Sequence, residues 1–266
     1  MIVEWNTHIF SSDEAKYPFH PWAAYKPRPE MRLEDPLGDY MERMKTEGID
    51  RAVLVHPEPY GDDHSLVLDC LKREPDIFKI TSLFYPSESD SPARLKSLVE
   101  AEPRVIATRF HRLQGKDEYL KDFTDPGVEA IWETAASLGI WIELHIGSDF
   151  ALSARRLIEA FPSTLVLIDH LAEPHTAHGV EFAHVLDLAN LDNVYMKLSG
   201  LNHFKTDEPL YESALPFTRV VSNAFGADRM VWGSGSSRFV DTHLAHWSEA
   251  DRAKVLGENL KSLLGF

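Results

Sequence analysis

Hydrophobic and polar positions follow two alternating periods along this chain, and the alternation predicts strands followed by helices. Short, nearly continuous apolar runs recur, as is typical of strands buried on both faces of a parallel sheet. Between the runs, apolar residues are spaced three or four apart, which predicts helices. The predicted strands are residues 1–10, 51–57, 80–86, 105–111, 140–147, 164–170, 194–200 and 230–235.

The predicted helices lie after these strands, at residues 36–48, 64–73, 93–100, 125–138, 151–161, 180–191, 210–225 and 249–264. The fourth shows the local signals most fully, because Asp125 suits its N-cap, Pro126 its first turn and Gly139 its end. Eight strands alternating with eight helices, without a linker, predict an α/β fold. We expect a single (β/α)8 barrel of the TIM type over residues 1–266.

The segment after the first predicted strand, residues 11–35, breaks the alternation. Residues 17–29 of this segment contain four prolines and four aromatic residues. Proline discourages both helix and central strand, and the aromatic residues argue against disorder. Long ordered loops in compact domains are usually functional. We therefore expect a Pro- and aromatic-rich flap over the mouth of the barrel.

Composition narrows the possible partners. The formal net charge is −15, which argues against nucleic acid and anionic membranes as partners and leaves a small anionic substrate open. No apolar run approaches the ~18 residues that span a membrane. Cys70 is the only cysteine, so no internal disulfide framework is expected, and the N-terminus lacks a signal-peptide pattern. We expect a cytoplasmic protein, and the sequence predicts no oligomeric state.

Polar residues gather where the predicted strands end. In such a barrel the carboxyl ends of all strands converge on one mouth. Their convergence suits acid–base chemistry, metal binding or carboxylate binding, although each histidine could instead satisfy hydrogen bonds in the core. The candidates are His8, His145 and His170 as catalytic residues, and Asn6, Tyr25, Lys26, His56, Arg109, His111, Ser199, Ser234, Gly235 and Arg238 as substrate-binding residues.

Several local motifs occur in a fairly specific order nearly from end to end. They include Asn6-Thr-His8-Ile-Phe10, Ile168-Asp-His170-Leu followed by Pro174, Val194-Tyr-Met-Lys-Leu-Ser-Gly200 and Asp228-Arg-Met-Val-Trp-Gly-Ser234. Through these motifs the chain resembles the amidohydrolase superfamily. Within the superfamily it resembles the lactonase-like branch, which includes 2-pyrone-4,6-dicarboxylate lactonase and sugar lactonases. The resemblance implies a hydrolase that opens a lactone or similar cyclic ester of a small carboxylated or polyhydroxylated substrate.

Two positions depart from the superfamily pattern. The first strand of the superfamily typically reads Asp-x-His-x-His, and Glu4, Asn6 and His8 occupy that pattern here. An aspartate usually follows the eighth strand and acts as the base, where this chain has Gly235. The superfamily metal site would use these positions, so we expect no metal. The alternative is a single Zn²⁺ on His8, His145 and His170.

Gly235 leaves three explanations open: another base, an inactive protein, or a deliberate substitution. Since side chains alternate along a strand, Glu4, Asn6 and His8 are expected to share one face, and Asp169 to point away from the face of His170. Arg109, with Lys26 or Arg238, is expected to bind a substrate carboxylate in a two-pronged contact. The remaining roles are polarisation of the carbonyl by His8, His170 and Asn6, and activation of water by His145, Glu4, Asp241 or His243.

Two other functions stay open at this point. The same fold and histidines could serve a decarboxylase or another lyase. Alternatively, the chain could be a substrate-binding protein whose catalysis is impaired at Gly235.

Overall fold

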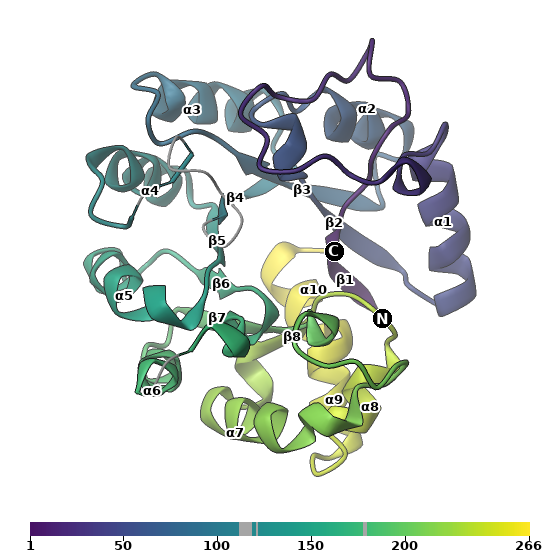
Figure 1. The fold of residues 1–266 in the computed structure, drawn as a ribbon, viewed down its shortest axis with the longest axis vertical. Helices are drawn as coiled ribbons and strands as arrows, with labels where there is room; N and C mark the ends of the chain where they lie inside the picture. Colours follow the sequence, from purple (N-terminus) through teal and green to yellow (C-terminus); the bar gives the residue numbers. More distant parts are fainter. Residues whose placement is uncertain (112–118, 121, 178–179) are drawn as a thin grey trace.

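Eight parallel strands, joined in sequence order, form the centre of the molecule. The computed structural model describes residues 1–111, 119–120, 122–177 and 180–266. β8 contacts β1, so the sheet curls into a nearly closed barrel, and the predicted (β/α)8 fold is confirmed (Figure 1). The assignment of the whole chain to one domain stays a prediction. The strands are β1 (Val3–Thr7), β2 (Arg51–Val55), β3 (Phe78–Leu83), β4 (Val105–His111), β5 (Trp141–His145), β6 (Val166–Ile168), β7 (Val194–Leu198) and β8 (Met230–Trp232).

Helices surround the strands on the outside, as Figure 1 shows. Local capping explains where two of them begin and end. Asp35 and Asp125 accept hydrogen bonds from backbone N–H groups of the first turns of α1 and α4, and left-handed Gly48 and Gly139 end these helices. The first seven are α1 (Pro36–Glu47), α2 (Ser65–Arg73), α3 (Ser91–Ala101), α4 (Pro126–Leu138), α5 (Ala151–Ala160), α6 (Glu181–Asp187) and α7 (Leu215–Phe225). Within the described residues, no helix combines the length and apolarity needed to cross a membrane.

The segment after β8 differs from the prediction of one long helix. It contains α8 (Arg238–His243), α9 (Glu249–Ala253), a π-helical turn (Lys254–Glu258) and α10 (Asn259–Leu264). The π-helical turn packs on the start of β1, where a Cβ on Gly257 would lie 2.5 Å from the carbonyl oxygen of Met1. Only glycine allows this close approach of two backbones.

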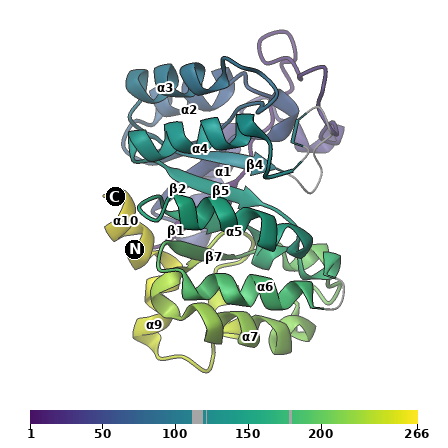
Figure 2. The same cartoon turned by 90° about the vertical axis from the view of Figure 1, so that its left-hand side faces the viewer.

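The interior of the barrel changes character along the strands. Inward-facing residues run Ala107, Arg109, His111 on β4, and β5 repeats the order with Trp141, Glu143 and His145. Both termini lie at one end of the barrel (Figure 2). Apolar side chains fill this end, charged groups follow, and histidines lie at the carboxyl ends of the strands. The apolar end consists of Val3, Trp5, Val53, Val55, Ala107, Trp141, Leu167 and Val231.

The segment between β1 and α1 is an ordered flap, as predicted. Its Tyr17 is buried and donates a hydrogen bond to Asp69, and the Ala24 N–H donates one to Glu58 at 2.9 Å. These contacts hold the flap against the elements that follow β2. They bring Tyr25 to the carboxyl ends of the strands.

Candidate active site

A polar cavity of about 330 Å³ lies at the carboxyl ends of the strands. Most of the residues that line it were predicted as site residues from their places at strand ends, although their roles remain predictions. The lining consists of Asn6, His8, Tyr25, Glu58, Arg109, His111, His145, His170, Gly200, Asn202, His203 and Ser234.

A bulge in β1 decides which of its side chains reach this cavity. The register with β2 shifts between Trp5 and Thr7, so the alternation of side chains changes phase. Trp5 faces the interior and donates its indole N–H to Glu143 at 3.0 Å, and Asn6 and His8 also face inward. Glu4 points to the opposite face. The prediction that Glu4 shares a face with Asn6 and His8 is therefore wrong.

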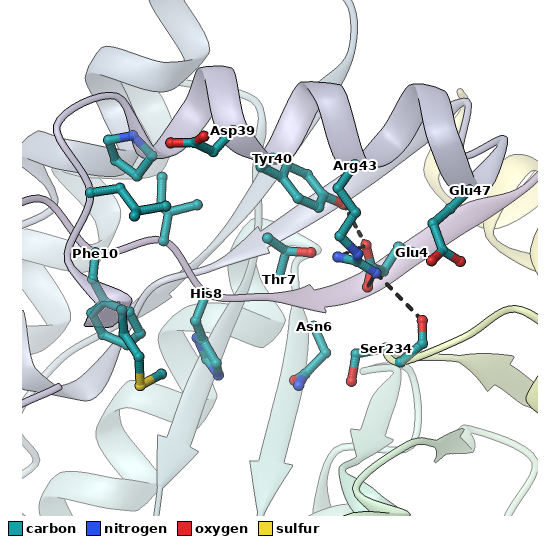
Figure 3. A pocket seen from close by; sticks show the side chains of 15 residues that line it. Glu4, Asn6, Thr7, His8, Phe10, Asp39, Tyr40, Arg43, Glu47 and Ser234 are labelled. Atoms are coloured by element: carbon teal, nitrogen blue, oxygen red, sulfur yellow. Dashed lines mark hydrogen bonds and ion pairs between the residues drawn. The ribbon is translucent and has the colours of Figure 1, made fainter. Parts of the chain in front are cut away.

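Glu4 is held outside the barrel by two residues of α1. Its carboxylate accepts hydrogen bonds from the Tyr40 hydroxyl at 2.6 Å and from the Arg43 guanidinium at 2.7 Å. Figure 3 shows this group on the α1 side of the strand, with Asn6 and His8 extending from the other side. Glu4 is among the groups that, from the sequence, could activate water. Its position outside the barrel makes it unsuited to that role in the cavity.

Four charged side chains, all fully or nearly fully buried, form the layer beneath the cavity. Lys197 Nζ lies 2.7 Å from Glu143 and 2.6 Å from Asp169. Arg109 donates to Asp169 through Nε at 3.1 Å and Nη2 at 2.6 Å. Two cations face two anions, so the layer is balanced, and the neighbouring cations hold the pKa of Asp169 well below its usual range although burial opposes them.

The assignment of Asp169 to the outer face of its strand is wrong. Its backbone N–H still donates to Leu144 at 2.9 Å, so the alternation continues from the inward-facing Leu167 to Asp169. His170 follows and would face outward in a regular strand. Its φ of 51° turns the chain instead, which brings His170 back to the cavity.

A run of left-handed residues begins at His170. His170, Leu171, Ala172 and Glu173 have φ values of 51°, 57°, 57° and 46°, and each such conformation costs a non-glycine residue roughly 1–2 kcal/mol. His170 is fixed by a 2.8 Å hydrogen bond between its Nδ1 and the Ser199 hydroxyl. Strain of this kind is concentrated at functional sites.

The same turn brings Glu173 next to three histidines that line the cavity. Its Oε1 accepts hydrogen bonds from His145 Nε2 at 2.9 Å and His203 Nδ1 at 2.7 Å. Potential ligand atoms of His145, His170, Glu173 and His203, here called the His–Glu cluster, all lie within 4.8 Å of one another. Sequence reasoning missed Glu173 and His203 because both lie in loops beyond the strand ends.

The buried histidines of the cavity are neutral at pH 7. Burial is the largest cause: it lowers the pKa of His8 to about 3, with the charge of Arg109 as the next cause. Burial likewise holds the pKa values of His111, His145 and His170 well below 6.5. These neutral rings can therefore accept hydrogen bonds or bind metal ions, and they contribute no positive charge.

Five predicted substrate-binding residues do not line the cavity: Lys26, His56, Ser199, Gly235 and Arg238. His56 leaves β2 on the outer face, where its Nε2 donates to the Gly61 carbonyl at 2.8 Å. Lys26 lies over the Phe19 ring at 5.5 Å, and Arg238 begins α8. A position near a strand end or in the flap does not determine the direction of a side chain, and the substrate-binding role of these residues stays a prediction. Ser199 contacts the site through His170.

Two candidate bases near β8 also lie elsewhere. Asp241 forms an ion pair with Arg252 at 3.0 Å on the surface. His243 is buried, and its Nε2 donates to the Leu210 carbonyl at 2.8 Å. Of the four predicted water-activating groups, only His145 lines the cavity.

Gly235 lies in a second pocket, of about 440 Å³, between α1, β1 and the turn after β8. Its φ is 86°, its carbonyl oxygen lies 3.4 Å from Arg43 Nη2, and a Cβ there would overlap the Phe239 ring. The turn is thus shaped for glycine. The two cavities share Asn6, His8 and Ser234.

The residues at the usual metal position of the superfamily do not fit a metal. Glu4 points away, Asn6 Oδ1 accepts from Lys197 at 3.3 Å, and Gly235 has no side chain. The contacts of His8 also bear on the alternative zinc site on His8, His145 and His170. His8 Nδ1 donates to the Val55 carbonyl at 2.9 Å, and His8 is not among the potential ligands grouped with His145 and His170.

Comparisons with known proteins agree with this architecture. The amidohydrolase family model matches residues 4–266. The 4-sulfomuconolactone hydrolase of Rhizobium radiobacter is 28% identical over 236 residues, covering 86% of this chain and 74% of that protein. The L-fucono-1,5-lactonase of Burkholderia ambifaria is 29% identical over 192 residues, covering 70% and 64%.

A solved structure extends the likeness over the full length. The crystal structure of a probable 2-pyrone-4,6-dicarboxylic acid hydrolase from Acinetobacter baumannii, with citric acid bound, superimposes with a TM-score of 0.80. It is 16% identical and covers 100% of this chain and 99% of that one, which shows a common fold. On the match of the family model to nearly the whole sequence, the chain belongs to the amidohydrolase family.

Proposed function

We propose that this protein is a hydrolase that opens a lactone or similar cyclic ester of a small carboxylated or polyhydroxylated substrate. Water would attack the ester carbonyl at the barrel mouth. The observation that carries the proposal is a single polar cavity where strand-end residues, neutral histidines and the Arg109 guanidinium meet. The names of the relatives, which act on a sulfomuconolactone and a fuconolactone, support the same reaction class.

The cavity suits a small substrate with a negative charge. Its volume of about 330 Å³ is at the small end of ligand sites. Asp169 engages Nε and Nη2 of Arg109, and Nη1 has no hydrogen-bond partner among the described residues. We therefore expect a substrate carboxylate or sulfonate to meet one edge of Arg109, instead of the two-pronged contact expected from the sequence.

Asn6 is suited to polarise the carbonyl. Lys197 Nζ donates to its Oδ1 at 3.3 Å, which orients the amide so that its NH2 group is available to an oxygen that gains negative charge. His8 has a different role, because its Nδ1–H is used by Val55. Neutral His8 therefore presents Nε2 as an acceptor, which can hold a water but, with a pKa of about 3, is a weak base.

A panel of lactones, with released acid titrated at constant pH, tests the proposal. Asn6→Ala should lower kcat by on the order of 100-fold, as loss of an oxyanion donor does elsewhere, whereas Asn190→Ala, at an exposed position on the outside, should not change it. Carbon dioxide released in place of acid would indicate a decarboxylase. Ligand binding without turnover of any lactone would indicate a binding protein.

We also propose a cytoplasmic location without nucleic-acid or membrane partners. Cys70 is buried and unpaired, as is usual in reducing compartments, and the net charge of −15 disfavours polyanions. Recovery of the protein in a membrane or secreted fraction of its source cells would contradict this proposal.

A further inference from the structure

The carboxylate of the His–Glu cluster lacks a permanent positive partner. Glu173 is fully buried, and its ion-pair partners within the described part of the chain are His145, His175 and His203, with no lysine or arginine. An imidazole is not a fixed cation, unlike a lysine or an arginine side chain. An uncompensated buried carboxylate is costly, whereas Glu143 and Asp169 in the layer below each face a cation.

The donor atoms of the cluster are those that zinc prefers. Zinc is typically held by four nitrogen, sulfur or oxygen ligands, at about 2.0–2.1 Å for nitrogen, which separates the ligand atoms of a tetrahedron by roughly 3.3 Å. Three imidazoles and one carboxylate lie here with potential ligand atoms within 4.8 Å. Small side-chain rotations would be enough to bring the atoms to such distances.

The surroundings hold these side chains in position. Ser199 occupies Nδ1 of His170 at 2.8 Å and leaves Nε2 available, as outer contacts of metal-binding histidines do. The left-handed turn places His170 and Glu173 in the cluster together. Gly200 makes room for it, because a Cβ there would lie 2.6 Å from the His170 Cβ.

We propose that His145, His170, Glu173 and His203 bind one zinc-type divalent cation. The site keeps the histidines of β5 and of the turn after β6. It takes Glu173 and His203 where the superfamily would use the first strand and the residue after β8. It therefore differs both from the metal-free expectation and from the zinc alternative with His8. Four protein ligands would complete a tetrahedral shell, so the proposal concerns binding of the ion and gives it no step in the reaction.

Metal binding can be measured without any substrate. Protein stripped of metal by chelation is titrated with Co²⁺, followed by visible absorption, and with Zn²⁺, followed by calorimetry and elemental analysis. One ion per chain is expected. Glu173→Gln and His203→Gln should each weaken binding by at least the 10–100-fold that loss of an outer contact costs. His203 is partly exposed, with 32% of its side chain accessible, so its variant should fold.

Two control variants locate the ion. His175→Gln removes an exposed imidazole 3.6 Å from Glu173 and should leave the affinity unchanged. His8→Gln should also leave it unchanged, since His8 lies outside the cluster. Absence of stoichiometric binding, or binding that survives both Glu173→Gln and His203→Gln, would overturn the proposal. Binding lost only in His8→Gln would place the ion elsewhere and overturn it too.

The outcome is independent of the proposed function. A protein that binds one ion through the cluster but hydrolyses no lactone would support the site and reject the function. Turnover of lactones by metal-free protein with no measurable ion affinity would support the function and reject the site.

Discussion

Gly235 shows how one residue can limit the chemistry of a barrel mouth. Its backbone is left-handed, and the Phe239 ring occupies the space where a side chain would begin. An aspartate at this position would therefore have to distort the turn before it could act as a base. The loss of the usual carboxylate is accommodated by the packing of α8, so restoring the side chain alone should not restore its function.

Gly235→Asp should therefore lower stability without raising activity. Left-handed strain of about 1–2 kcal/mol adds to overpacking of roughly 1–3 kcal/mol against Phe239. Gly265→Asp is the matched control, since Gly265 is also left-handed but has nothing within 4 Å of its Cβ position. Urea unfolding should show the larger loss at 235. Equal losses in the two variants, or a gain in lactone hydrolysis at 235, would contradict the expectation.

Single residues also show where sequence reasoning reaches its limit. His145 and His111 were predicted because they end strands, and period-two alternation determines their direction. Glu173 could not be found this way, since it joins the His–Glu cluster through a run of four left-handed residues that no apolar pattern encodes. The direction of the Asp169 side chain was predicted wrongly for a related reason: its neighbour His170 has already left the strand.

At the scale of an element, β1 is the strand in which pattern and structure diverge most. An alternating row of polar residues predicted a single polar face, but the bulge after Trp5 splits that row. Glu4 turns to α1 while Asn6 and His8 stay in the barrel. A bulge inserts one residue without altering composition, so alternation alone could not reveal it. The contacts of Glu4 with α1 now fix the register of the strand.

Arg43→Gln should destabilise the protein through this contact. Among the described residues, it leaves the fully buried Glu4 carboxylate with only Tyr40 as a hydrogen-bonding side chain, and breaking a buried pair costs several kcal/mol. Because 37% of the Arg43 side chain is exposed, solvent screening reduces the expected loss to about 1–3 kcal/mol. Chemical denaturation of the variant measures it.

The exposed pair Arg73–Asp35 provides the control for this prediction. Both of its side chains are about half accessible, so Arg73→Gln should cost only about 0–1 kcal/mol. The double variant Glu4→Gln/Arg43→Gln removes the orphaned charge and should regain part of the loss. If Arg43→Gln and Arg73→Gln lose the same stability, Glu4 is not held as described.

At the scale of the whole molecule, the barrel was predictable and its charged interior was not. Nearly continuous apolar strands at regular intervals specify a parallel sheet covered by helices. The ionic layer depends on partners far apart in sequence, such as Arg109 and Asp169, which are 60 residues apart. The place of Arg109 at the end of a predicted strand marks it as a site residue but does not indicate its ion-pair partner. The ion pair of Arg109 with Asp169 depends on how β4 lies relative to the end of β6, which the apolar pattern does not specify.

The buried histidines should make the folded protein sensitive to mild acid. In the folded state burial lowers the pKa of His56 to about 4 and that of His64 well below 6.5, whereas both return to about 6.5 on unfolding. Above pH 6.5 both states are neutral and pH has no effect through these groups. Between pH 6.5 and about 4 the unfolded chain binds more protons than the folded protein. As the pH falls through this range, each such histidine therefore lowers the free energy of unfolding by about 1.4 kcal/mol per pH unit.

His64 provides the sharpest test of this acid sensitivity. Its Nε2 accepts a hydrogen bond from the Leu83 N–H at 3.1 Å, which requires the unprotonated ring. Urea unfolding of metal-free protein at pH 7.5 to 4.5 should show stability falling with pH. In His64→Gln, whose side chain does not titrate, the slope should be shallower by about one proton. Asn190→Ala, at an exposed position with a side chain that does not titrate, should keep the slope of the unaltered protein. An unchanged slope in His64→Gln would mean that His64 is already protonated in the folded state, and the Leu83 hydrogen bond could not then exist as described.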